Sequence, residues 1–150
     1  MLIFSQFVGM LQMIRRRLGR EGVQTLYLDG ETKPEKRQEL CDRFNGGEGR
    51  VFLISLKAGG TGLNLTGADL VIHYDPWWNP ATEDQATDRA HRIGQTRDVD
   101  VVKLITQGSI EEKVTDMSKR KRAVFNRVVM AGETDLGSLT EEDIRALFFN

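Results

Sequence analysis

The chain has a single cysteine, Cys41, so no disulfide can form within it. A lone cysteine favours a reducing compartment, and its place in the helical stretch ELCDRF indicates a small buried hydrophobic side chain. Long apolar runs are also absent: VFLI and DLVI are far too short to span a bilayer, so we expect no membrane partner. With 39% hydrophobic and 29% charged residues, the composition of the 150 residues is that of an ordinary globular protein.

The sequence also lacks a complete phosphate loop. The pattern G-x-x-x-x-G-K-[ST] occurs nowhere, and G-x-G-x-x-G fails because Leu65 stands where the third glycine would be. The glycine-rich stretch KAGGTGLNL (57–65) still lets a backbone approach a ligand closely, although glycines that ease a tight turn would look the same. The sequence therefore lacks the lysine that a self-sufficient ATP site of this kind needs.

The net charge of −1 does not by itself indicate a nucleic-acid-binding protein, but the charge is unevenly distributed. The segments 15–20 (RRRLGR) and 119–122 (KRKR) are basic, whereas 133–143 carries five acids and no base. Basic runs are often only solvated helix faces. They become evidence for nucleic acid only where other features agree.

Short apolar runs alternate with stretches of helical periodicity along the chain. Strands are expected at 1–5, 23–28, 50–56, 68–75 and 98–105. Helices are expected at 7–19, at 32–44, from Asn79-Pro80 through the arginines near 90, from Ser109 to about Met130, and after Thr140. Capping boxes of Thr32 with Glu35 and of Ser109 with Glu112 should begin two of the helices. This order predicts an α/β fold, a parallel sheet with helices on both faces.

Three loops that carry functional residue types follow strands of the predicted sheet: LDGET, SLKAGGTGLNL and HYDPWWNP. In such sheets, ligands bind outside the carboxyl ends of the strands, so we expect the loops at one edge. The segment QATDRAHRIGQ comes next and places Gln85, Arg89 and Arg92 on one helical stripe. Either the arginines face an anion, or they pair with the neighbouring Asp84 and Asp88.

Taken in order, DGET, FN, ISLKAGGTGLNLTGADLVIHYDPWWNP and QATDRAHRIGQ resemble the motifs of the second RecA-like lobe of Swi/Snf-type ATPases, in helicase superfamily two. The resemblance covers residues 1–130 and implies a RecA-like sheet. Residues 131–150 would be a C-terminal helical extension of the same lobe. The chain would then be part of a larger ATP-hydrolysing motor that translocates along double-stranded DNA, and would be inactive alone.

The resemblance also implies the nucleotide-binding residues. Arg89 and Arg92 would act on the γ-phosphate of ATP from across a cleft, with Gln85 orienting them, and Gly60, Gly62 and Asn64 would border the nucleotide. A planar, permanently charged guanidinium suits the charge that spreads over a transferring phosphoryl group. The first RecA-like lobe of the same parent protein would supply the phosphate loop and the Mg²⁺ ligands, so no metal site is expected here.

The DNA side follows from the same motifs. Gly30 and Thr32 would offer an amide and a hydroxyl to a DNA phosphate, Ser5 and Gln6 would also face phosphate, and Lys57 would add a positive charge. Trp78 would face the minor groove, with Trp77 structural. Two alternatives stay open: an RNA-directed helicase lobe, disfavoured because Gln95 replaces a typical arginine, and a non-catalytic interaction module. The protein would be cytoplasmic and nucleoid-associated in a bacterium or archaeon, and nuclear in a eukaryote.

Overall fold

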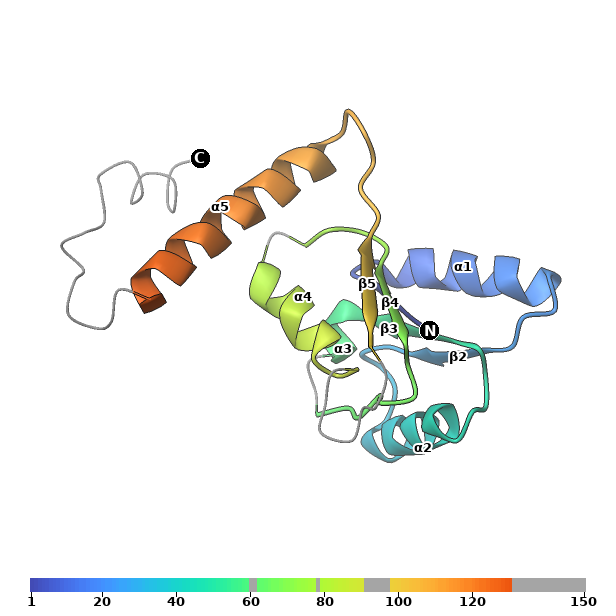
Figure 1. Cartoon of the computed structure of the whole chain (residues 1–150). Helices are drawn as coiled ribbons and strands as arrows, with labels where there is room; N and C mark the ends of the chain where they lie inside the picture. Colours follow the sequence, from blue (N-terminus) through green and yellow to red (C-terminus); the bar gives the residue numbers. More distant parts are fainter. Residues whose placement is uncertain (60–61, 78, 91–97, 131–150) are drawn as a thin grey trace. The chain divides into compact units, whose positions relative to one another are not determined.

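The computed structural model describes residues 1–59, 62–77, 79–90 and 98–130. Its centre is a five-stranded parallel sheet in the order β2-β3-β1-β4-β5 (Figure 1). The strands are β1 (Leu2–Ser5), β2 (Thr25–Leu28), β3 (Val51–Ser55), β4 (Leu70–His73) and β5 (Asp100–Lys103). All five lie inside the segments that the sequence predicts, and the predicted fold class is confirmed.

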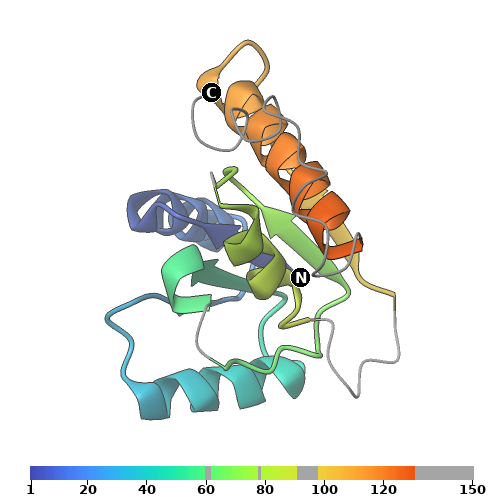
Figure 2. The ribbon, with the colours of Figure 1, turned by 90° about the vertical axis from the view of Figure 1, so that its left-hand side faces the viewer.

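Two helices cover opposite faces of this sheet, α1 (Val8–Arg20) and α2 (Pro34–Asn45) (Figure 2). On one face, Leu11 of α1 packs with Ile3 and Leu53 of the sheet. On the other face, Phe44 of α2 packs against Phe52, with ring centroids 5.4 Å apart. The alternation of side chains along each strand is what allows β1 and β3 to be buried on both sides.

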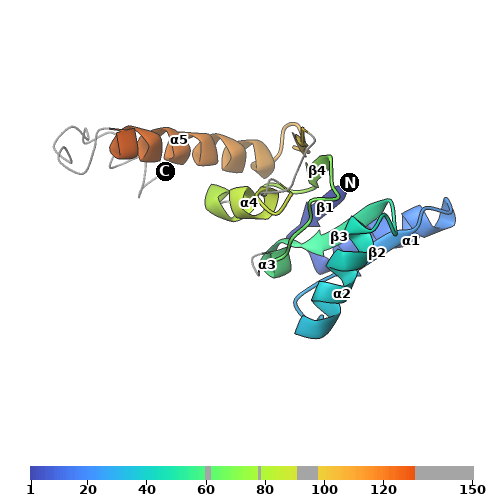
Figure 3. The ribbon, with the colours of Figure 1, turned by 60° about the horizontal axis from the view of Figure 1, so that its bottom comes forward.

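The parallel register brings the carboxyl ends of the strands to a common edge. Ser5 pairs with Ser55, and Phe4 pairs with His73. The short helix α3 (Leu56–Gly59) continues directly from β3 at this edge (Figure 3). The predicted functional loops therefore begin where the sequence places them.

The structure corrects two helix predictions. The helix that begins at Pro80, α4, ends at Thr87, so Arg89 lies in the turn that follows and not on the helix. The predicted capping box of Thr32 with Glu35 is wrong: Lys33 is the N-cap residue of α2 and makes no side-chain cap. Pro34 does occupy the first turn, as expected.

The chain divides into two compact units, Met1–Pro76 with Ala81–Ile105, and Trp77–Pro80 with Thr106–Asn150. The second unit contains α5 (Ile110–Met130), which ends where the sequence predicts. Ser109 Oγ accepts the N–H of Glu111 at 3.1 Å, and the Glu112 carboxylate accepts the N–H of Gly108 at 3.1 Å. Ser109 and Glu112 thus cap this helix, one residue out of the standard pattern. Among the described residues, no helix is both long and apolar enough to cross a membrane.

Candidate functional site

The turn after β2 is built around the carboxylate of Asp29. Tyr27 donates its hydroxyl to Asp29 Oδ2 at 2.9 Å, and the N–H of Glu31 donates to Oδ1 at 3.0 Å. Thr32 Oγ1 donates to the same Oδ1 at 3.2 Å and accepts the N–H of Asp29 at 3.1 Å. Burial would raise the pKa of Asp29, but these hydrogen bonds together lower it below its ordinary value. The turn is therefore held by an ionised carboxylate.

Arg37 of α2 fixes the outside of the same turn. Its guanidinium donates to the carbonyl of Thr32 at 2.7 Å and to that of Gly30 at 3.2 Å. Gly30 itself is exposed, has open space around its Cα, and its N–H meets no acceptor among the described residues. An amide on a rigid turn is thus left available, whereas the proton of the Thr32 hydroxyl is already used by Asp29.

The carboxyl ends of β1 and β4 are joined through Asp75. Ser5 Oγ donates to Asp75 Oδ2 in a short hydrogen bond, and the N–H of Gln6 donates to Oδ1 at 2.9 Å. Ser5 and Asp75 are only 1% and 7% exposed. The buried hydroxyl of Ser5 thus helps to hold the ends of β1 and β4 together, and its predicted contact with a DNA phosphate stays a prediction.

Lys57 lies on α3, one residue beyond the start of that helix, and its side chain is exposed. Ser55 Oγ accepts the N–H of Ala58 at 3.3 Å and so begins the short helix. The ammonium of Lys57 is thereby presented at the carboxyl edge, at the start of the glycine-rich stretch.

The glycine-rich loop is clamped by Asn45 at the end of α2. Asn45 Nδ2 donates to the carbonyl of Asn64 at 2.9 Å, and Asn45 Oδ1 accepts the N–H of Gly67 at 2.9 Å. A Cβ on Gly67 would lie 3.1 Å from Asn45 Cα, so a side chain here would push the two segments apart by a few tenths of an ångström. Gly62 has φ +47°, which a side chain would strain. The buried thiol of Cys41, whose pKa burial raises, lies beneath Asn64, as the sequence predicts for a buried cysteine.

The clamped loop is hydrogen-bonded in turn to the arginine segment. The N–H of Leu65 donates to the carbonyl of Arg89 at 3.0 Å. Arg89 is 6% exposed, so its side chain is largely shielded from solvent. Gln85 and Asp88 are exposed. Arg92, Gly60 and Trp78, which the sequence assigns to the site, lie outside the described residues.

A buried polar cluster lies behind this edge. His73 is 1% exposed, stacks on Phe4 with ring centroids 5.6 Å apart, and meets Thr87 Oγ1 at 2.9 Å from Nε2. Glu83, 3% exposed, forms an ion pair with Lys103 of β5. Burial lowers the pKa of His73 below its ordinary value; Glu83 opposes the shift and Lys103 adds to it. The cluster attaches α4 to the sheet just before Arg89.

Comparison with known proteins identifies this arrangement. Residues 1–94 match the family model described as helicase conserved C-terminal domain. The chain belongs to this family. The crystal structure of the C-terminal part of the Fun30 ATPase domain resembles it with a TM-score of 0.75 and 43% identity, over 78% of this chain and 38% of that one. The RecA-like fold of a Swi/Snf-type helicase lobe is thereby confirmed.

Two curated relatives extend the comparison over nearly the whole chain. YwqA of Bacillus subtilis (strain 168), which bears the name of an ATP-dependent helicase/translocase, is 45% identical over 98% of this chain and 16% of its own length. Helicase swr1 of Aspergillus fumigatus is 44% identical over 96% of this chain and 9% of its own. The chain thus spans less than a fifth of the length of these relatives.

The sequence reading of this helicase domain assigned no role to Asp75, Asn45 or Arg37. Asp75 ends the predicted strand 68–75, and Asn45 ends the helix before a glycine pair, so both had a local signal. Their partners, Ser5 and Gly67, are far away in the chain, and only the fold identifies them. Among the residues described, no group of three or more His, Cys, Asp or Glu side chains could hold a metal ion.

Proposed function

We propose that this helicase domain is the second lobe of an ATP-dependent motor that translocates along or remodels duplex DNA. One observation carries the proposal: the Leu65–Arg89 hydrogen bond and the Asn45 clamp join the glycine-rich loop and the arginine segment at the carboxyl edge of the sheet. Ligands of parallel α/β sheets bind at this edge. The phosphate loop and the Mg²⁺ ligands would come from a first RecA-like lobe, so the chain alone would not hydrolyse ATP.

On the nucleotide side, we assign the γ-phosphate contact to Arg92. An arginine inserted into a phosphoryl-transfer site accelerates the reaction by about 10³- to 10⁵-fold. Arg89 is buried, so we assign it the role of holding the segment and adding positive charge behind the phosphates. Exposed Gln85 would orient the pair, and Gly60, Gly62 and Asn64 would border the nucleotide.

On the DNA side, the free amide of Gly30 and the exposed ammonium of Lys57 are the direct phosphate contacts that we propose, with Trp78 in the minor groove. Thr32 and Ser5 would act indirectly, because their hydroxyls hold the turns beside these contacts. Contacts to phosphates read no base sequence, so the binding should be non-specific and should weaken with salt.

ATP hydrolysis would be coupled to movement along DNA because the two lobes close on ATP and reopen after hydrolysis. Each cycle would then change which DNA contacts are made. Residues 1–130 would make up the lobe proper, with 131–150 as its helical extension. The localisation would follow that of the parent motor, with the bacterial nucleoid or the eukaryotic nucleus as the site of its DNA.

The test is a salt titration of duplex binding by the 150-residue chain. Lys57→Ala should flatten the log-log slope by about 0.9, which corresponds to one lost phosphate contact. Lys36→Ala is the matched control, because Lys36 is an exposed lysine of α2 that already pairs with Glu39. The same preparation should show no DNA-stimulated ATP hydrolysis. A turnover of about 1 s⁻¹, typical of a working enzyme, would contradict the assignment of a half-site. Tighter binding of duplex RNA than of DNA would favour an RNA-directed lobe.

A further inference from the structure

A second polar site adjoins the turn that carries Gly30. An open cavity of about 490 Å³ lies between α1 and β2, lined by Gln12, Arg15, Arg16 and Tyr27. All four side chains carry hydrogen-bond donors, and two carry a permanent positive charge. Neither the nucleotide site nor the DNA contacts proposed above use any of these residues.

The cavity is ordered by Tyr27. The guanidinium carbon of Arg15 lies over the ring of Tyr27, 5.3 Å from its centroid, which is a cation–π contact. The hydroxyl of Tyr27 donates to Asp29, and Gln12 also hydrogen-bonds to this hydroxyl. Burial is the main reason that the pKa of Tyr27 is raised, and the hydrogen bond and negative charge of Asp29 raise it further. The hydroxyl therefore stays protonated and acts as a donor. The floor of the cavity is therefore tied directly to the Asp29 turn.

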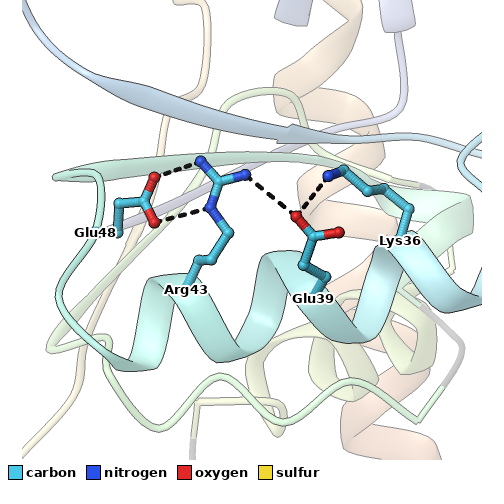
Figure 4. A network of polar contacts seen from close by, with 4 residues as sticks. All are labelled: Lys36, Glu39, Arg43 and Glu48. Atoms are coloured by element: carbon cyan, nitrogen blue, oxygen red, sulfur yellow. Dashed lines mark hydrogen bonds and ion pairs between the residues drawn. The ribbon is translucent and has the colours of Figure 1, made fainter.

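The two arginines of the cavity are not neutralised. Arg15 and Arg16 are exposed and form no ion pair within the described part of the chain. Their neighbour Arg17 differs, since it pairs with Glu21 at 2.9 Å. Three charged residues of α2 are paired as well: Arg43 contacts both Glu48 and Glu39, and Lys36 contacts Glu39 (Figure 4). Two adjacent unpaired guanidiniums are stable only where solvent or an anionic partner lies in front of them.

We propose that this cavity binds the phosphate backbone of the same duplex, with Arg15 and Arg16 extending the track that begins at Gly30. The inference rests on the proposed DNA-binding function. The cavity is continuous with the proposed DNA contact at Gly30, because the hydroxyl of Tyr27 in its lining is hydrogen-bonded to Asp29 of the same turn. A duplex offers a phosphate charge about every 1.7 Å of its axis, so it can fill both points at once. An acidic peptide would also bring backbone N–H groups, for which this lining offers only the Gln12 carbonyl and the Tyr27 hydroxyl as acceptors.

The experiment is the salt dependence of binding of a fluorescent duplex to the full chain. The double variant Arg15→Ala/Arg16→Ala should flatten the log-log slope by about 1.8, so that between about 50 and 200 mM salt it loses about tenfold less affinity than the unaltered chain. Arg15→Lys/Arg16→Lys keeps both charges and should retain the slope. Arg17→Ala, whose arginine is already paired on the same helix, should leave both slope and affinity unchanged.

The outcomes separate this inference from the proposed function. If Lys57→Ala flattens the slope and the double alanine variant does not, the cavity is not a DNA contact, although the proposed function stands. If the unaltered chain binds no duplex, both fail. If the double variant loses binding of a poly-glutamate peptide while its DNA slope is unchanged, the partner of the cavity is an acidic polypeptide, and the inference is overturned.

Discussion

The N–H of Leu65 donates a 3.0 Å hydrogen bond to the carbonyl oxygen of Arg89. This bond joins the glycine-rich loop after β3 to the segment after α4, so a shift of either one must move the other. Because Asn45 holds the same loop from α2, the loop is restrained from two sides. The proposed motor function needs this property if nucleotide and DNA contacts are to respond together.

The two arginines of the segment should respond differently to substitution. Arg89→Ala should cost about 2–3 kcal/mol of unfolding free energy, because Arg89 is buried and has a partner. Arg92→Ala should stay within about 0.5 kcal/mol in the isolated chain, yet cut ATP turnover about 10³-fold in a two-lobe protein. Urea unfolding and ATPase assays measure the two effects. A destabilised Arg92→Ala chain whose two-lobe parent keeps normal turnover would refute the assignment of the γ-phosphate contact.

Asp75 should be among the most sensitive polar residues of the lobe. Asp75→Ala removes the acceptor of the Gln6 N–H and leaves the buried Ser5 hydroxyl with only the longer 3.3 Å contact to the carbonyl of Phe7. Each unpaired buried group costs about 1–3 kcal/mol, so the free energy of unfolding in urea should fall by about 2–4 kcal/mol. Asp88→Ala, at an exposed position, serves as the control and should change it by less than about 0.5 kcal/mol. Equal effects of the two variants would mean that Asp75 does not hold the carboxyl ends of β1 and β4 together.

The Asn45 clamp can be tested by amide hydrogen exchange. Asn45→Ala removes two hydrogen bonds to the loop, and should speed exchange of the Gly67 amide about tenfold or more, which corresponds to about 1.4 kcal/mol. Gln38→Ala on the same helix loses only a local bond to Asp42 and should leave that amide unchanged. Unaltered protection of Gly67 in Asn45→Ala would mean that other contacts hold the loop.

Stability should depend on pH through His73. Its pKa is lowered in the folded state, so below about pH 6.5, the ordinary value for histidine, the unfolded chain takes up a proton that the folded chain refuses. The stabilisation is complete above that pH and is lost as the pH falls through it. His73→Asn should remove this part of the dependence, measured by urea unfolding between about pH 5 and 7.5. His91→Asn leaves His73 in place and should retain this pH dependence. If His91→Asn abolished the pH dependence instead, His91 and not His73 would be its source.

The sequence determined the elements of this protein because their signals are local. Apolar runs such as VFLIS located the strands, and turn residues such as Asp29-Gly30 located the loops at the carboxyl edge. Local patterns were less accurate at helix ends: α4 stops at Thr87, two residues before Arg89, and Thr32 bonds to Asp29 instead of capping α2.

Only the tertiary structure decided which polar groups meet. Ser5 and Asp75 are 70 residues apart in the chain and touch because β1 lies beside β4 in the strand order. Arg15 meets Tyr27 because α1 packs over the β2 side of the sheet, and no spacing within the sequence encodes that crossing. A buried polar group must find a partner, but its identity depends on which strands are neighbours, and that depends on the whole chain at once.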